Sequence, residues 1–167
     1  GAAARASRDE FQALFAAGRY AEALPHAQRL VAAAESTAAG VPDVVASLTD
    51  LGITQLRLGS FRDAEASYMR ALDALGSGEA VFSLRYVAPL AGLAAVYAAE
   101  GRHAEAVDFF GQAIAVSRRS LGLFNELQAP LIDSQIASLV SLGRYDEAEA
   151  GHRYLVRITT RSFGEND

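Results

Sequence analysis

Three histidines are the side chains most suited to acid-base or metal chemistry in this chain, and their spacing does not assemble a site. His26, His103 and His152 stand far apart in the sequence, and no two of them have the short separation typical of metal ligands. We interpret His103 and His152 as structural replacements for aromatic residues, and His26 as an exposed residue.

Other reactive patterns are missing as well. The sequence contains no Gly-rich phosphate loop, no HExxH pair and no nucleophile elbow. Glu147 and Glu149 are close in sequence, but two positions apart on a helix their carboxylates point away from each other. The absence of cysteine also excludes thiolate metal sites. We therefore expect no enzyme activity, no catalytic residue, no metal site and no cofactor.

A short motif that begins with glycine recurs four times, and the turns it predicts determine which side chains share a surface. Each glycine is followed five positions later by alanine, and in three of the four copies an aromatic residue stands two positions after the glycine. Glycine can adopt the positive φ that ends a helix, and the small alanine lets two helices approach closely. The motifs begin at Gly18, Gly59, Gly101 and Gly143, which are separated by 41, 42 and 42 residues.

Apolar residues at helical spacing flank each glycine. They include Leu48 and Leu51 before Gly59, and Ala64 and Tyr68 after it. Such spacing predicts a helix on both sides of every turn. We therefore predict an all-α chain with eight main helices in one domain, made of units at about residues 3–40, 41–80, 81–122 and 123–164.

These motifs resemble the tetratricopeptide repeat (TPR), a helix-turn-helix unit. The 42-residue period, with Val41-Pro42-Asp43-Val44 leading into a first helix and Arg119-Ser120-Leu121-Gly122 closing a second, is similar to the kinesin-light-chain-like variety of the repeat. The resemblance implies a right-handed superhelical solenoid of four TPR units whose first helices line a concave face. The asparagine pair common in those first helices is replaced here by Thr49-Asp50, Ala91-Gly92 and Asp133-Ser134, so peptide recognition that depends on the asparagines is not implied.

The register of the first helices predicts which side chains project into the concave face. They are mostly small, flanked by a few charged groups, and a surface of this kind either admits the bulky side chains of a peptide or is simply a solvated face. Because the chain has no lysine, a lysine clamp on a terminal carboxylate is not expected. The predicted partner-binding residues are Thr49, Asp50, Ile53, Arg57, Ala91, Ala95, Asp133, Ala137 and Ser141.

Charge and hydropathy narrow the classes of partner. A net charge of −5 and a pI near 5.2 argue against non-specific nucleic-acid binding, which needs a basic surface. No apolar run is long enough to span a bilayer, and the first residues lack the apolar centre of a signal peptide, so we expect no membrane partner and a cytoplasmic location. All basic residues are arginine, which together with the alanine content suggests a bacterial, GC-rich genome.

The function predicted from these features is a protein-protein interaction module, or scaffold, that binds a peptide or partner domain of unknown identity. One alternative is a structural segment that self-associates through its last helix, around Tyr154 and Ile158. Another is the sensing arm of a larger bacterial regulator or enzyme. Tyr154, Leu155, Val156 and Ile158 make the last predicted helix apolar where a terminal repeat is normally polar, so we also expect the chain to be a fragment of a longer array.

Overall fold

The computed structural model of the chain describes residues 2–36, 40–76 and 83–163, and every regular element in them is a helix. The prediction of an all-α chain is confirmed for these residues. In chain order the elements are α1 (Ala2–Ala16), α2 (Tyr20–Ser36), α3 (Val41–Arg57), α4 (Phe61–Gly76), the 3-10 helix η1 (Leu84–Tyr86), α5 (Val87–Ala99), α6 (His103–Leu121), α7 (Gln128–Ser141) and α8 (Tyr145–Phe163).

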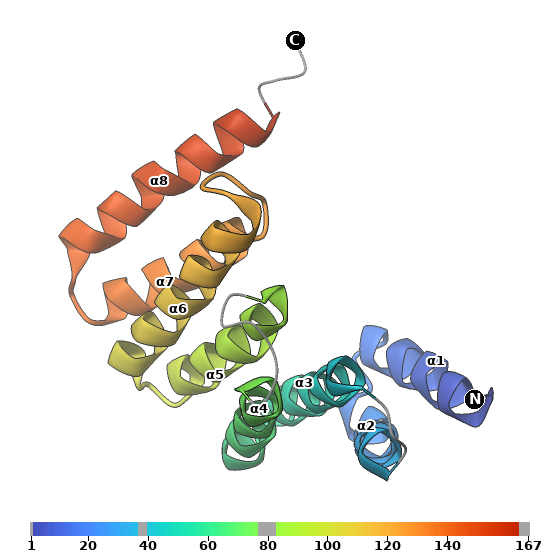
Figure 1. Cartoon of the computed structure of the whole chain (residues 1–167). Coiled ribbons are helices and arrows are strands. Elements are labelled where there is room, and N and C mark those ends of the chain that lie inside the picture. The colour runs from blue at the N-terminus through green and yellow to red at the C-terminus, as the bar shows by residue number, and fades with distance from the viewer. Residues whose placement is uncertain (1, 37–39, 77–82, 164–167) are drawn as a thin grey trace. The chain divides into compact units, whose positions relative to one another are not determined.

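The helices fall into two compact units, residues 1–79 and residues 80–167. Within the first unit α1 packs on α2, α2 on α3 and α3 on α4 (Figure 1). Within the second unit α5 packs on α6, α6 on α7 and α7 on α8. Each helix therefore packs mainly on its neighbours in the chain, as in a stack of helix-turn-helix units. That the four predicted units form one domain stays a prediction.

The recurring glycines end the first helix of each hairpin as the sequence predicts. Gly101 has a φ of +77°, and the N–H of the next residue, Arg102, donates back to the carbonyl of Tyr97 at 2.8 Å. This bond satisfies a carbonyl that the end of a helix would otherwise leave unpaired. The same positive φ occurs at Gly18, Gly59 and Gly143, and the alanines that follow, Ala23, Ala64, Ala106 and Ala148, are all buried.

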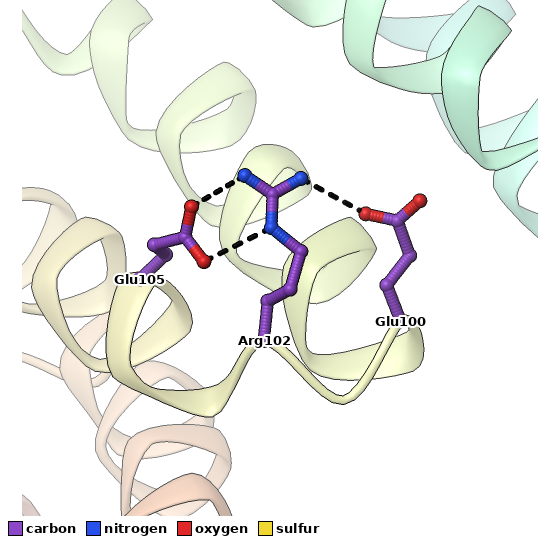
Figure 2. Close-up of polar contacts among 3 residues, drawn as sticks. All are labelled: Glu100, Arg102 and Glu105. Atoms are coloured by element: carbon purple, nitrogen blue, oxygen red, sulfur yellow. Dashed lines mark hydrogen bonds and ion pairs between the residues drawn. The ribbon is translucent and has the colours of Figure 1, made fainter.

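An ion pair between an arginine and a glutamate three residues later links the two sides of three of the four turns. Between α5 and α6, Arg102 Nε donates to Glu105 Oε2 at 2.9 Å, and Arg102 Nη1 donates to Glu100 Oε2 at 3.1 Å (Figure 2). The bond to Arg102 lowers the pKa of Glu105 below its ordinary value. Arg19 with Glu22 and Arg144 with Glu147 repeat the arrangement. Because all three pairs are exposed, each stabilises its turn only modestly.

In the α3–α4 hairpin the large side chain between the two helices comes from the second helix, whereas in the α7–α8 hairpin it comes from the first. In α3, a Cβ added to Gly52 would lie 2.9 Å from the ring of Tyr68 on α4. In the last hairpin the large residue is Ile136 on α7, and a Cβ added to Gly151 on α8 would lie 2.8 Å from it. The interpretation of His152 as a structural replacement for an aromatic residue of the core is wrong, because His152 is exposed. Since Ile136 already fills the space between α7 and α8, residue 152 has no gap to fill.

Candidate functional site

Four of the predicted binding residues lie on α3, in the first unit. Asp50 is half-buried, and Nη1 of Arg8 on α1 lies 3.6 Å from its Oδ2. Thr49 is also half-buried, and its hydroxyl donates to the carbonyl of its own helix at Val45, at 2.8 Å. Ile53 is half-buried, and Arg57 is exposed in the last turn of the helix. Asp50 and Arg57 therefore supply the charges of this surface.

The other five predicted residues lie in the second unit, on two helices that contact each other, α5 and α7. Ala91 and Ala95 on α5 are half-buried. Asp133, Ala137 and Ser141 on α7 are exposed, and the Ser141 hydroxyl donates to the carbonyl of Ala137 at 3.0 Å. The only carboxylate among these five residues is Asp133. That either set binds a partner stays a prediction.

Asp50 is disfavoured in its charged form. Burial raises the pKa of its carboxyl above the ordinary value, and the nearby charge of Arg8 offsets this only in part. A raised pKa in the folded state means that the ionised carboxylate costs stability at neutral pH. This cost disappears as the pH falls through the folded pKa.

We expect Asp50→Asn to raise the free energy of unfolding at neutral pH by a small amount, and this difference from the natural chain to decrease as the pH is lowered. Urea denaturation of both proteins in steps from neutral pH to about pH 4 measures the difference in free energy of unfolding. Asp43→Asn, which changes an exposed aspartate on the same helix, is the matched control. A difference in free energy of unfolding that increases as the pH is lowered would contradict the expectation.

A groove of about 420 Å³ lies in the second unit between α6 and α8, over α7. Figure 1 shows α6 and α8 running in the same direction, with α7 joining them. The buried residues Ile114, Ile132 and Leu139 are among those that line it. The groove is open because its α6 and α8 walls include small residues, namely Gly111, Ala115, Ala150 and Gly151.

One end of the groove is formed by Arg118 and Tyr154, which are held by a buried amide. Gln128 is fully buried, and its Oε1 accepts from Arg118 Nε at 3.1 Å and from the Tyr154 hydroxyl at 3.2 Å. Its Nε2 donates to the carbonyl of Leu123 at 3.0 Å and to that of Gly122 at 3.3 Å. The Arg118 guanidinium also stacks over the Tyr154 ring, 4.4 Å from its centroid. Arg118 is thus held in place by the protein itself.

The Glu147 carboxylate lies at the opposite end of the groove. Glu147, in the first turn of α8, lines the groove and bonds Arg144 at 2.6 Å. The pKa of Arg144 is raised, first by its bond to Glu147 and also by the charge of Asp108 on α6. The groove therefore has an apolar middle, Arg118 at one end and Glu147, paired with Arg144, at the other. Such a surface is suited to binding.

The structure corrects the expected self-association surface. Ile158 is only 1% exposed, and Tyr154 is half-buried in its bonds to Gln128. Both side chains face the interior of the second unit, because α8 packs this face on α7. Val156, which is 63% exposed, is the residue of the expected apolar group that faces solvent.

The groove was not predicted from the sequence, although residues that change in size from one repeat to the next could have indicated it. Gly151 stands where Phe109 stands one repeat earlier, and Gln135, which also lines the groove, stands where the buried Leu93 does. The prediction that His26 is exposed is also wrong: His26 is half-buried, and its Nδ1 lies 3.5 Å from Glu10 Oε2.

Within the described residues, no helix is both long and apolar enough to cross a membrane. The same residues contain no group of three or more His, Cys, Asp or Glu side chains able to hold a metal ion.

Comparisons with known proteins agree on the repeat. A model of the family described as "Tetratricopeptide repeat" matches residues 12–77, and a second model of the same description matches residues 90–126. No curated protein matches the sequence.

Several solved structures are similar to the whole chain. One, of nearly identical TPR-like repeats from a Podosopora anserina protein described as a kinesin light chain, has a TM-score of 0.81 at 19% identity, over 95% of this chain and 76% of that one. Another structure of such repeats has a TM-score of 0.63 at 15% identity, over 95% and 96%. BtubC (BKLC) from P. vanneervenii has a TM-score of 0.71 at 18% identity, over 94% of this chain and 59% of BtubC. At these identities the likeness bears on the fold alone, and it confirms the predicted solenoid class.

Proposed function

Because this chain belongs to the tetratricopeptide repeat family, with repeats of the kinesin-light-chain-like variety, we propose that it binds a peptide or a partner domain on the surface of its first helices. Tetratricopeptide repeats generally mediate protein-protein interactions, and this fold is a non-catalytic type of scaffold. In this proposal no bond is made or broken.

The observation that supports the proposal best is the uncovered face of α7. Ile132, Ile136 and Leu139 are buried, whereas the predicted binding residues Asp133 and Ala137 on the same helix are exposed. A first helix that is packed on one side and open on the other leaves a row of small side chains beside a carboxylate. Bulky partner side chains can bury apolar area against such a row.

Charged groups orient the partner in this proposal. Asp50 and Arg57 act on α3 and Asp133 acts on α7, each beside small or apolar neighbours. Charge pairs that lose water when two proteins meet contribute to the choice of partner and to its orientation.

We expect the double variant Asp50→Arg, Asp133→Arg to lose its partner, with affinity reduced at least about tenfold, because two favourable charge pairs become repulsive. The measurement is a pull-down from lysate of the source cell with the natural chain and the variant, followed by titration of the captured protein. Circular dichroism and thermal unfolding verify that both proteins are folded. Asp133→Arg alone is the safer variant, because Asp133 is exposed and Asp50 lies beside Arg8.

The matched control is Asp43→Arg, Glu126→Arg, which makes the same change of charge at two exposed positions. It is expected to retain the partner. Equal retention by all three folded proteins would contradict the proposed surface. Recovery of nothing but further copies of this protein would instead favour self-association, for which the exposed Val156 is the side chain to change.

A further inference from the structure

We propose that the groove between α6 and α8 is a second docking site, which takes an amphipathic helix of a partner protein with an acidic first turn. In this arrangement the partner helix runs antiparallel to α6 and α8, and its acidic turn lies beside Arg118. The inference shares with the proposed function the premise that the domain binds proteins. It concerns different residues, on α6, α8 and the side of α7 that faces them, so the two are tested separately.

The shape of the groove suits one face of a short helix. The α6 wall extends from Val107 to Arg118, which corresponds to about three helical turns, or roughly 16 Å. A volume of about 420 Å³ accommodates a few large side chains and lies within the range of ordinary binding pockets. A partner helix of three turns presents such side chains at positions i, i+3 or i+4, and i+7.

The small residues of the walls lie where a docked helix would approach most closely. Ala115 on α6 and Ala150 on α8 are exposed, and the neighbouring Gly111 and Gly151 have no side chain. The buried Ile114 and Ile132 line the groove beneath them. The partner's apolar face can therefore reach apolar side chains without first displacing a bulky one.

Charge complementarity decides what the partner presents at the Arg118 end. The Nε of this arginine donates to Gln128, and the flat face of its guanidinium stacks on the Tyr154 ring. Within the described part of the chain, these contacts leave its two Nη groups to meet a carboxylate. A preorganised arginine loses less side-chain entropy on pairing than a flexible one. An acidic residue of the partner is the natural counterpart.

The opposite end of the groove fixes the direction of the helix. Glu147 and Asp108 lie in or near the first turns of α8 and α6, and Arg118 lies in the last turn of α6. Helices commonly have acidic residues in the first turn and basic residues in the last. A partner helix of that ordinary kind matches both ends only when it runs antiparallel to α6 and α8. Its dipole then also opposes theirs.

Two synthetic helical peptides of identical composition test the proposal. Both carry leucines at i, i+3 and i+7; one has glutamates in its first turn and lysines in its last, and the other has them exchanged. Fluorescence anisotropy with the whole chain is expected to show that the acid-first peptide binds at least about tenfold more tightly. A third peptide, the acid-first sequence with a central proline, is expected to bind poorly because it cannot form the helix.

Variants of the chain locate the binding. Ala115→Trp and, separately, Ala150→Trp place a large side chain in the groove from an exposed position and are expected to abolish binding of the acid-first peptide. Arg118→Met is expected to weaken binding of that peptide about fivefold and to reduce the preference for the acid-first charge order. Arg62→Met, at an exposed arginine of α4 in the other unit, is the matched control and is expected to change nothing.

Several outcomes would overturn the proposal. These are no binding of the acid-first peptide, equal affinity for both charge orders, or affinity that survives both tryptophan variants. Full binding of the proline peptide would assign the groove to an extended segment. A dimer of the natural chain that disappears in Ala115→Trp would assign it to a second copy. Asp50→Arg, Asp133→Arg must leave peptide affinity unchanged; a loss there would place the peptide on the first helices instead.

Discussion

Gln128→Leu is expected to lower the free energy of unfolding by about 3 kcal/mol. The amide of Gln128 is fully buried and makes four hydrogen bonds. Leucine has a similar volume but no polar atom. It therefore removes one donor from each of the Gly122 and Leu123 carbonyls, which keep their bonds from Asn125 Nδ2 and the Tyr154 hydroxyl, and it leaves Arg118 Nε without its acceptor. Polar groups left unpaired in the interior lose the hydration they have in the unfolded chain.

The matched control is Gln135→Leu, the same substitution on the same helix. Gln135 is half-buried, and its amide makes one hydrogen bond, from Nε2 to the carbonyl of Val107 at 3.0 Å. One repeat earlier the same position is Leu93, which is fully buried. We expect this variant to change the free energy of unfolding by less than about 1 kcal/mol. Urea denaturation of both variants gives the comparison, and equal losses would contradict a special role for Gln128.

The two variants also separate the stability of the fold from the shape of the groove. If Gln128 holds Arg118 in place, a Gln128→Leu protein studied well below its midpoint temperature of unfolding should show a smaller preference for the acid-first peptide. Gln135→Leu should keep that preference, because it leaves the contacts of Arg118 unchanged.

The architecture could be predicted because it depends on features that recur in the sequence. A positive φ at Gly101 needs a residue without a Cβ, and the close approach of two helices needs the small side chain of Ala106. Both requirements are local. They appear as a fixed spacing that a single sequence displays, and the family matches at residues 12–77 and 90–126 agree with it.

The groove and the surroundings of α8 could not be predicted in the same way. If the four repeats are treated as equal copies, residues at equivalent positions of the repeat are expected to have the same surroundings. His152 was therefore expected to resemble Tyr68, which is at the equivalent position. The exchange of a large residue on α7 for a small one on α8, Ile136 against Gly151, breaks that equivalence. Likewise, Tyr154 looked like an exposed apolar residue. Its hydroxyl in fact bonds Gln128, 26 residues away in the sequence, a contact between helices that no spacing rule reveals.

Gly52→Ala is expected to lower the free energy of unfolding by about 2 kcal/mol, although alanine is the better helix former by about 1 kcal/mol. The added Cβ would lie 2.9 Å from two carbon atoms of the Tyr68 ring. That ring is only 2% exposed, so it cannot turn away without disturbing its neighbours. Overpacking of this kind forces shifts in the backbone or the rotamers. Thermal and urea unfolding measure the loss.

Gly111→Ala separates the packing effect from helix propensity. Gly111 also lies inside a helix, α6, but there the nearest atom to an added Cβ is Nε2 of Gln135, at 3.4 Å. This is the end of a flexible, half-buried side chain, which can move by a few tenths of an ångström. With little packing cost, the propensity gain should dominate and stabilise the protein by about 0.5–1 kcal/mol. Stabilisation by both alanines would mean that Tyr68 yields easily and that α3 and α4 are not held apart by its ring. Opposite signs would show that the ring of Tyr68 makes glycine necessary at position 52.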